Sequence, residues 1–274
     1  MTRVGVLHPG SMGSSLGAAA RTAGADVYWC EAGRSEETKR RALEDGLSAL
    51  PHLRDLAGCD VLISVCPPHA ALDLARDVAG LGFRGLYVDA NAVSRATALL
   101  IGAEVTRGGA AFVDGGILGP PVRAGRTTLL CLSGERAAEV ARLFEGTPLQ
   151  PSIVGAAPGQ ASALKMAFAA WSKGSTALLI AVRALAEAEG VTEGLLESWA
   201  RLSPDLAQRS EQAALGAAPK AWRWSGEMRE IAQSFASVGL PPDFHEAAAK
   251  LYEKLDAFKT EEASLPAVLR ALLR

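Results

Sequence analysis

Cysteine and histidine are scarce in this chain of 274 residues, with four of each. The four cysteines have no C-x-x-C spacing and no neighbouring cluster of histidines, which argues against a structural zinc site. We therefore expect no metal. We interpret all four as reduced cysteines in the core of a cytoplasmic protein: Cys30, Cys59, Cys66 and Cys131.

An excess of charge of one sign is also lacking, since the formal net charge is -2. No long basic run is present, so we expect no nucleic-acid partner. The most apolar long stretch, residues 157–188, is interrupted by Lys165, Lys173 and Arg183, which favours a buried helix over a membrane span. The first residues lead directly into an apolar strand pattern, and we expect no signal segment.

Apolar residues are abundant, at 49% of the chain, and their pattern is most informative near the beginning. Residues 4–7 form a short apolar run, typical of a buried strand. A turn with Gly10 and Gly13 follows, and then an alanine-rich helical segment that Gly24 ends. This strand, glycine turn and helix predict a dinucleotide site, with Gly10, Ser11, Met12 and Gly13 at the pyrophosphate.

The glycine turn departs from the usual pattern of three glycines, because His8 occupies the first position. His8 must form the tight turn with a Cβ, while Pro9 favours extended backbone there. Two interpretations of His8 stay open: an extra donor near a phosphate, or a tolerated turn residue.

Strands and helices alternate over the first half of the chain, which predicts a doubly wound, mostly parallel sheet. We expect further strands at 25–30, 61–66, 85–89, 111–114 and 127–132. Between them we expect helices at 35–45, capped by Ser35, and at 69–79. Two more are expected, one capped by Ser94 and one that begins at Ser133. A turn-rich connection is expected at 115–125.

Strand patterns almost disappear after residue 159. One helix is expected over 161–189, long enough to cross a domain or subunit interface. Others are expected at 193–202, 204–215, 220–238, 242–260 and 266–273. The sequence therefore predicts an α/β fold of two parts, a Rossmann-type dinucleotide domain at 1–156 and an all-helical domain at 157–274 that binds substrate and dimerises.

The end of the second expected strand bears on cofactor choice. Glu31 there would accept hydrogen bonds from a free ribose diol, which favours NAD. Arg34 and Ser35 follow, and both could hold a 2′-phosphate, although an ordinary solvated helix start is the alternative. We favour NADP, with NAD possible.

Two later loops should face the same crevice, because ligands of open parallel sheets bind at the carboxyl ends of strands. One loop contains Cys66 and Pro67, and the other contains Asn91, whose amide can both donate and accept. A second glycine-rich segment, 114–121, could present backbone N–H groups to a carboxylate, with Gly119 the best candidate.

Lys165 lies in the first turns of the long helix, among small and apolar residues. A lysine held there is costly unless it is paired or used, and burial would suit it to acid–base chemistry. Lys173 is the rival candidate, and for either lysine a stem that reaches solvent is the alternative.

With these motifs in this order, the chain resembles the 6-phosphogluconate dehydrogenase-like superfamily, and more narrowly its β-hydroxyacid dehydrogenase group. The resemblance implies a Rossmann domain, a helical domain, a homodimer and a lysine acid/base at Lys165. It also places Asn91 at a polar site position and residues 114–120 in a substrate loop.

Three positions depart from the pattern of that group. Its Ser-Gly-Gly is replaced by residues 118–120, its asparagine after the lysine by Ala169, and its Lys-Asp pair by Glu227 and Met228. The resemblance therefore implies the same hydride transfer on a different substrate. Trp222, Arg223 and Glu227 could form a pocket wall, or Trp222 could pack and Arg223 could join a structural ion pair.

We expect an NAD(P)-dependent oxidoreductase acting on a small hydroxy or keto acid. Asn91 and Lys165 would act at the reacting groups. One alternative is an NADPH-dependent imine reductase, against which the presence of Lys165 argues mildly. The other is a protein that binds NAD(P) without turnover.

Overall fold

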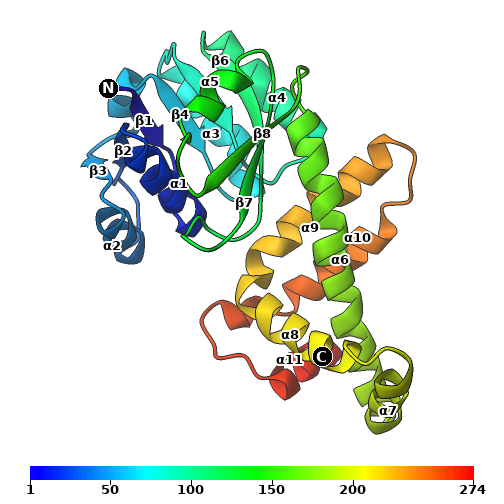
Figure 1. Ribbon diagram of the computed structural model, residues 1–274. Coiled ribbons are helices and arrows are strands. Elements are labelled where there is room, and N and C mark those ends of the chain that lie inside the picture. Colours follow the sequence, from blue (N-terminus) through cyan, green and yellow to red (C-terminus); the bar gives the residue numbers. More distant parts are fainter. The chain divides into compact units, whose positions relative to one another are not determined.

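The computed structural model describes residues 1–274, which form two compact units, 1–166 and 167–274 (Figure 1). The division lies within the long helix α6 (Gln160–Ala188). The domain division that we expect at residue 156 falls earlier in the chain and stays a prediction. Each unit is described by itself below.

The first unit contains an eight-stranded sheet with strand order β3-β2-β1-β4-β5-β6-β7-β8. All neighbouring strands are parallel except β6 and β7. The predicted α/β class and doubly wound, mostly parallel sheet are thus confirmed. The strands are β1 (Arg3–Val6), β2 (Asp26–Cys30), β3 (Ser48–Leu50), β4 (Val61–Ser64), β5 (Leu86–Asp89), β6 (Ala111–Leu118), β7 (Thr128–Ser133) and β8 (Leu149–Gly155).

Five helices connect these strands, and two of them begin at a predicted serine cap. The Oγ atoms of Ser35 and Ser94 accept the backbone N–H groups of Thr38 and Thr97, at 3.3 and 3.2 Å. Such caps satisfy donors that a helix start leaves unpaired. The helices are α1 (Ser11–Thr22), α2 (Glu36–Glu44), α3 (Pro68–Gly80), α4 (Arg95–Arg107) and α5 (Ala137–Arg142), with a 3₁₀ helix at Leu53–Gly58.

The two faces of the sheet carry separate apolar clusters. One cluster joins β1 and β4 to α1, with Leu16 and Ala20 fully buried, and the other joins the sheet to α3 and α4 through Leu74 and Ile101. Strands covered on both faces are almost continuously apolar, as residues 61–64 show. This packing fixes the carboxyl ends of the strands relative to one another.

Four features of the first unit differ from the prediction, and one of them is β8, a strand of seven residues that was not expected. β3 and the 3₁₀ helix after it were not expected, because both are short. The helix expected to begin at Ser133 begins four residues later, at Ala137. The turn-rich connection expected from residue 115 is wrong up to Leu118, because residues 115–118 continue β6 and pair with β7.

The second unit contains only helices. After α6 come α7 (Thr192–Leu202), α8 (Leu206–Ala217), α9 (Ala221–Ser237), α10 (Asp243–Glu253) and α11 (Leu265–Leu273), with 3₁₀ helices at Ala218–Lys220 and Asp256–Lys259. The predicted helical region is thus confirmed, although the helix expected over 242–260 ends at Glu253. No helix in the structure has the length and apolarity that a membrane crossing requires.

Candidate functional site

The glycine turn joins β1 to α1. The two glycines in it have different structural surroundings. A Cβ at Gly13 would lie 2.0 Å from the carbonyl oxygen of His8, so only glycine lets α1 pack against the turn. A Cβ at Gly10 would meet nothing within 4 Å. No side chain caps α1. The first N–H groups of the helix are therefore not used by a capping side chain, which favours binding of a phosphate there.

The residues after β2 differ in what they can offer a ligand. The Nη2 of Arg34 donates to the carbonyl oxygen of Leu7 at 2.9 Å, and its Nε is buried without a partner. Ser35 caps α2, so its hydroxyl is already engaged, while the Glu31 side chain is exposed. Arg34 is thus held beside the glycine turn with donors to spare.

A pocket of about 480 Å3 opens beside this turn. Three of the four histidines of the chain line it, His8, His52 and His69, and so does Arg34. Burial, and to a smaller degree the charge of Arg34, lowers the pKa of His8 from 6.5 to about 4. His8 is therefore neutral at physiological pH. Sequence reasoning missed His52, which the packing of β3 brings to the pocket, whereas it interpreted His69 as a residue in the first turn of a helix and not as a catalyst.

Asn91 ties together the carboxyl ends of β4 and β5. Its Oδ1 accepts the N–H of Cys66 at 2.6 Å, and its Nδ2 donates to Ser64 Oγ at 2.9 Å and to an oxygen of Asp89. The side chain is only 1% exposed. Both amide donors are thus used inside the protein, and the predicted contact of Asn91 with a ligand stays a prediction.

Cys66 and Pro67 lead from β4 into α3. Burial raises the pKa of the Cys66 thiol to about 12, so the thiol stays protonated and inert at neutral pH. Pro67 precedes the first residue of α3. Their predicted contact with a cofactor stays a prediction.

Lys165 lies against the part of β6 that extends past the end of β5. Register pairs Asp114 with Asp89, the last residue of β5, and the Nζ of Lys165 donates to Ile117 O at 2.6 Å. A Cβ at Gly115 would lie 2.9 Å from Asp89 O and 3.5 Å from Ala90 Cα. The lysine is therefore at the same edge of the sheet as Asn91 and Cys66.

The extension of β6 also corrects the proposed carboxylate nest. The backbones of Gly115 and Gly116 belong to the β6–β7 ladder and are not free to form a nest. Gly119 follows with φ of 116°, and its Cβ would lie 2.7 Å from Thr127 O. Glycine is thus required there by the turn itself, and substrate contact at Gly119 stays a prediction.

In the second unit, Lys173 and Glu227 form an ion pair, and both side chains are 11% exposed. The ammonium also lies 5.6 Å from the centre of the Trp224 ring. Glu227 is therefore engaged by Lys173, whereas Arg223 is exposed and Trp222 is 37% exposed. Their predicted role as a pocket wall stays a prediction.

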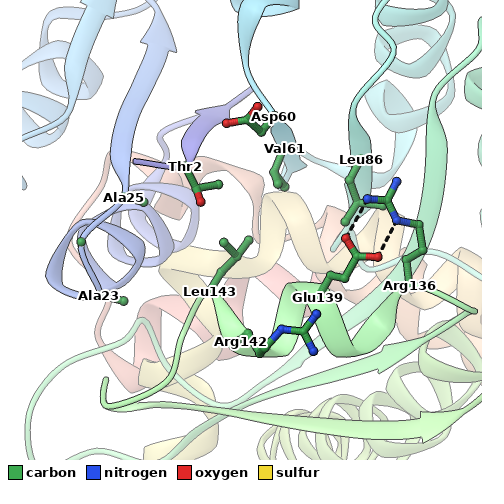
Figure 2. Close-up of a pocket in the computed structure, with 11 residues that line it drawn as sticks. Thr2, Ala23, Ala25, Asp60, Val61, Leu86, Arg136, Glu139, Arg142 and Leu143 are labelled. Carbon is green, nitrogen blue, oxygen red and sulfur yellow. Dashed lines mark hydrogen bonds and ion pairs between the residues drawn. The ribbon is translucent and has the colours of Figure 1, made fainter.

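A second pocket, of about 400 Å3, lies at the opposite edge of the sheet (Figure 2). Thr2, Val61 and Leu86 line it at the amino ends of parallel strands. Arg136 there forms two hydrogen bonds of 2.7 Å with Glu139. Because ligands bind at carboxyl ends in sheets of this kind, this pocket is the poorer candidate for a nucleotide. No group of three or more His, Cys, Asp or Glu residues in the structure could hold a metal ion.

Comparison with known sequences yields two matches. Residues 186–255 match a domain of unknown function, DUF1932. An uncharacterized 28.5 kDa protein of Methanothermus fervidus is 34% identical over 174 residues, which are 63% of this chain and 66%, just under two thirds, of that protein.

Comparison with solved structures extends over the whole chain. A conserved protein of unknown function, described as structurally similar to 3-hydroxyacid dehydrogenases, is 28% identical with a TM-score of 0.66, over 96% of this chain and 100% of that one. The 3-hydroxyisobutyrate dehydrogenase of Mycobacterium tuberculosis, solved with L-serine, is 19% identical with a TM-score of 0.72 over 100% of both chains.

Imine-reducing enzymes have the same fold. A reductive aminase of Aspergillus terreus, solved with NADPH, is 17% identical with a TM-score of 0.58, over 98% of this chain and 99% of that one. At such identities the likeness establishes the fold alone. The fold that the resemblance to the 6-phosphogluconate dehydrogenase-like superfamily implies is thereby confirmed, because 3-hydroxyacid dehydrogenases and imine reductases share it.

Proposed function

We propose that this protein is an NAD(P)-dependent oxidoreductase that transfers a hydride between nicotinamide and a small hydroxy or keto acid. The observation that carries the proposal is the place of Lys165. Its ammonium lies at the carboxyl edge of the sheet, held by Ile117 O, on the same edge as the turn of Gly10 and Gly13. A proton donor and a dinucleotide cradle on one edge are the parts such a reaction needs.

The residues of the first unit fit a dinucleotide. Gly10 leaves open space over the start of α1, and the Nε of Arg34 is buried without a partner beside the same turn. Backbone N–H groups at the start of α1 would hold the pyrophosphate. The pocket lined by His8 and His69 would take the adenosine half. When bound, the nicotinamide supplies or accepts the hydride.

Lys165 would act as the acid/base. Its Nζ gives a proton to the carbonyl oxygen of a keto acid during reduction, and it takes the proton from the alcohol in the reverse direction. Lys173 is less suited to this role because Glu227 already pairs with it. A substrate carboxylate would be held by positions other than the usual Ser-Gly-Gly, which this chain lacks at 118–120.

NADP is the cofactor that we propose. Arg34 supports it because a guanidinium binds a 2′-phosphate through charge-assisted hydrogen bonds. Glu31 would favour NAD, but its side chain is exposed, whereas Arg34 lines the pocket.

We also propose that the protein acts in a reducing cytoplasm, because its four cysteines are free thiols.

A homodimer is the assembly that we propose, with α6 at its centre. Apolar side chains recur along α6 at heptad spacing and are 40 to 71% exposed: Leu164, Phe168, Trp171, Leu178 and Leu185. A stripe of this kind on a helix is typical of a protein interface. A second copy of the chain would cover it with the same stripe.

The test is a turnover screen with purified protein. NADPH and NADH oxidation is followed with small keto acids and with cyclic imines, and the reverse reaction with hydroxy acids. We expect turnover with an acid and NADPH. Turnover with imines alone would identify an imine reductase, and tight NADPH binding without any turnover would identify a non-catalytic binding protein.

A further inference from the structure

Asp114 is a fully buried carboxylate that accepts three hydrogen bonds, two from serine hydroxyls and one from a backbone N–H. Its oxygens accept the Ser133 hydroxyl at 2.8 Å, the Ser162 backbone N–H at 3.0 Å and the Ser162 hydroxyl. A buried charge is costly unless such bonds compensate it. Every donor in this set belongs to or adjoins the start of α6.

The start of α6 depends on these bonds. Ala163 is the first residue of the helix whose N–H has a backbone partner one turn earlier, at Gly159 O. The N–H groups of Ala161 and Ser162 are instead accepted by Ser133 Oγ, at 3.1 Å, and by Asp114. Donors at a helix start need such acceptors, and a negative charge there also complements the helix dipole. Two strands thus cap α6 from outside the helix.

β6, the strand that contains Asp114, also contacts Lys165, beginning two residues further along the strand. A Cβ at Gly116 would lie 2.8 Å from Ala161 O and 2.9 Å from the Cβ of Lys165. Lys165 Nζ then reaches Ile117 O at 2.6 Å. Asp114, Gly116 and Ile117 therefore contact successive turns of α6, and the capped end determines where the lysine lies on β6.

We propose that Asp114 is the positioning residue for Lys165, acting through the start of α6. The carboxylate binds Ser162, which holds the helix at one rotation and one height on β6, and this places the Nζ of Lys165 at the carboxyl edge of the sheet. The inference rests on the proposed function for its catalytic meaning, but the placement of Lys165 is a claim about structure that needs no turnover.

The experiment compares Asp114→Ala, Asp114→Asn and Ser162→Ala in the full-length protein. For Asp114→Ala we expect kcat to fall about 100-fold, the loss that a misplacement of about 1 Å causes, with the Kd of NADPH within twofold of wild type. Asp114→Asn keeps an acceptor oxygen, so its kcat should be about tenfold higher than that of Asp114→Ala. Val140→Ala, a buried residue of α5, is the control for lost stability alone.

A spectroscopic readout works without turnover. Lysines are reductively methylated with ¹³C, and the Lys165 signal is assigned with Lys165→Arg. We expect this signal to shift in Asp114→Asn and Ser162→Ala while that of Lys250 does not. An unchanged Lys165 signal in both variants would overturn the proposal even if Asp114→Ala does not fold. A shifted signal in a protein without turnover would instead leave the positioning intact and remove only the proposed activity.

Discussion

Two lysines on one helix have different surroundings, and the difference separates their roles. Lys165 donates to a neutral backbone carbonyl, Ile117 O, among its contacts, and in the proposed reaction a substrate oxygen would replace this acceptor. Lys173 faces the Glu227 carboxylate, with the Trp224 ring on another side. An ion pair this poorly exposed would be costly to break. The acid/base role that we propose is therefore assigned to Lys165 and not to Lys173.

Replacing Lys165 with alanine should lower turnover by about 10³-fold, within the usual range for a lost general acid. The Kd of NADPH should change little, because the lysine does not lie at the glycine turn. Steady-state kinetics and cofactor fluorescence measure the two quantities. Lys250→Ala, on α10, is the matched control. Near-normal turnover without Lys165 would assign the proton transfer to another group.

Arg34 controls the expected cofactor preference. In Arg34→Ala the Kd of NADPH should rise by about 10- to 100-fold, because a charge-assisted bond contributes about 1.5 to 3 kcal/mol. The Kd of NADH should stay within about threefold. Titration with 2′,5′-ADP and 5′-ADP isolates the phosphate. Arg40→Ala removes a cation that pairs with Glu44 on α2, and it should affect neither. An equal loss for both dinucleotides would remove the 2′-phosphate role.

At the scale of elements, the packing of α1 against the first turn shapes the dinucleotide site that we propose. Gly13 lets the helix meet His8 O, and Gly10 keeps the space in front of the helix open. Gly13 is therefore needed by the folded protein, and Gly10 by the dinucleotide that we propose.

Alanine at these two glycines should have opposite effects. Gly13→Ala should lower the free energy of unfolding by about 1 to 3 kcal/mol, the usual cost of overpacking. Gly10 has a φ of -65°, and a Cβ there would meet no atom within 4 Å. Gly10→Ala should therefore change the free energy of unfolding little, while NADPH binding is lost. Denaturant unfolding and cofactor titration measure the two. A Gly10→Ala protein that binds NADPH normally would contradict the proposed cradle.

At the scale of the whole molecule, the exposed stripe of α6 is the interface of the homodimer that we propose. Trp171, at 71% exposure, is its most exposed member. A glutamate there should convert a dimer to a monomer, since two like charges would face each other across a two-fold axis. Light scattering during gel filtration gives the mass, and Leu43→Glu, also exposed at 76%, is the control. A monomeric wild-type protein would refute the dimer.

Acid should destabilise the whole protein through His8. Its pKa is about 4 when folded and 6.5 in a model peptide, so the unfolded chain binds more protons between these values. Stability is therefore fully present above pH 6.5 and decreases as the pH falls toward 4. After allowance for partial exposure, the lowered pKa of His8 accounts for about 1 to 2 kcal/mol of the free energy of unfolding that is lost between these pH values. His8→Asn should flatten this part of an unfolding-against-pH curve, and an unchanged slope would assign it to other groups.

Sequence patterns by themselves determined much of the fold. The apolar run before Gly10 and the caps at Ser35 and Ser94 depend on neighbours along the chain, and local physics is enough to predict them. The class of fold followed from the alternation of strands and helices. Lys165 also stood out, because a charge among small apolar residues is visible in one dimension.

Only the tertiary structure decided which residues meet. Asp114 and Ser162 are 48 positions apart in the chain, and nothing local marks either as part of a helix start. The segment after Asp114 looked like a loop because it is rich in glycine, yet pairing with β7 makes it a strand. His52 reaches the pocket through β3, a strand too short to show a pattern. Contacts between segments that are distant in the sequence leave no periodic pattern in it. The composition of the candidate site therefore became visible only in the folded structure.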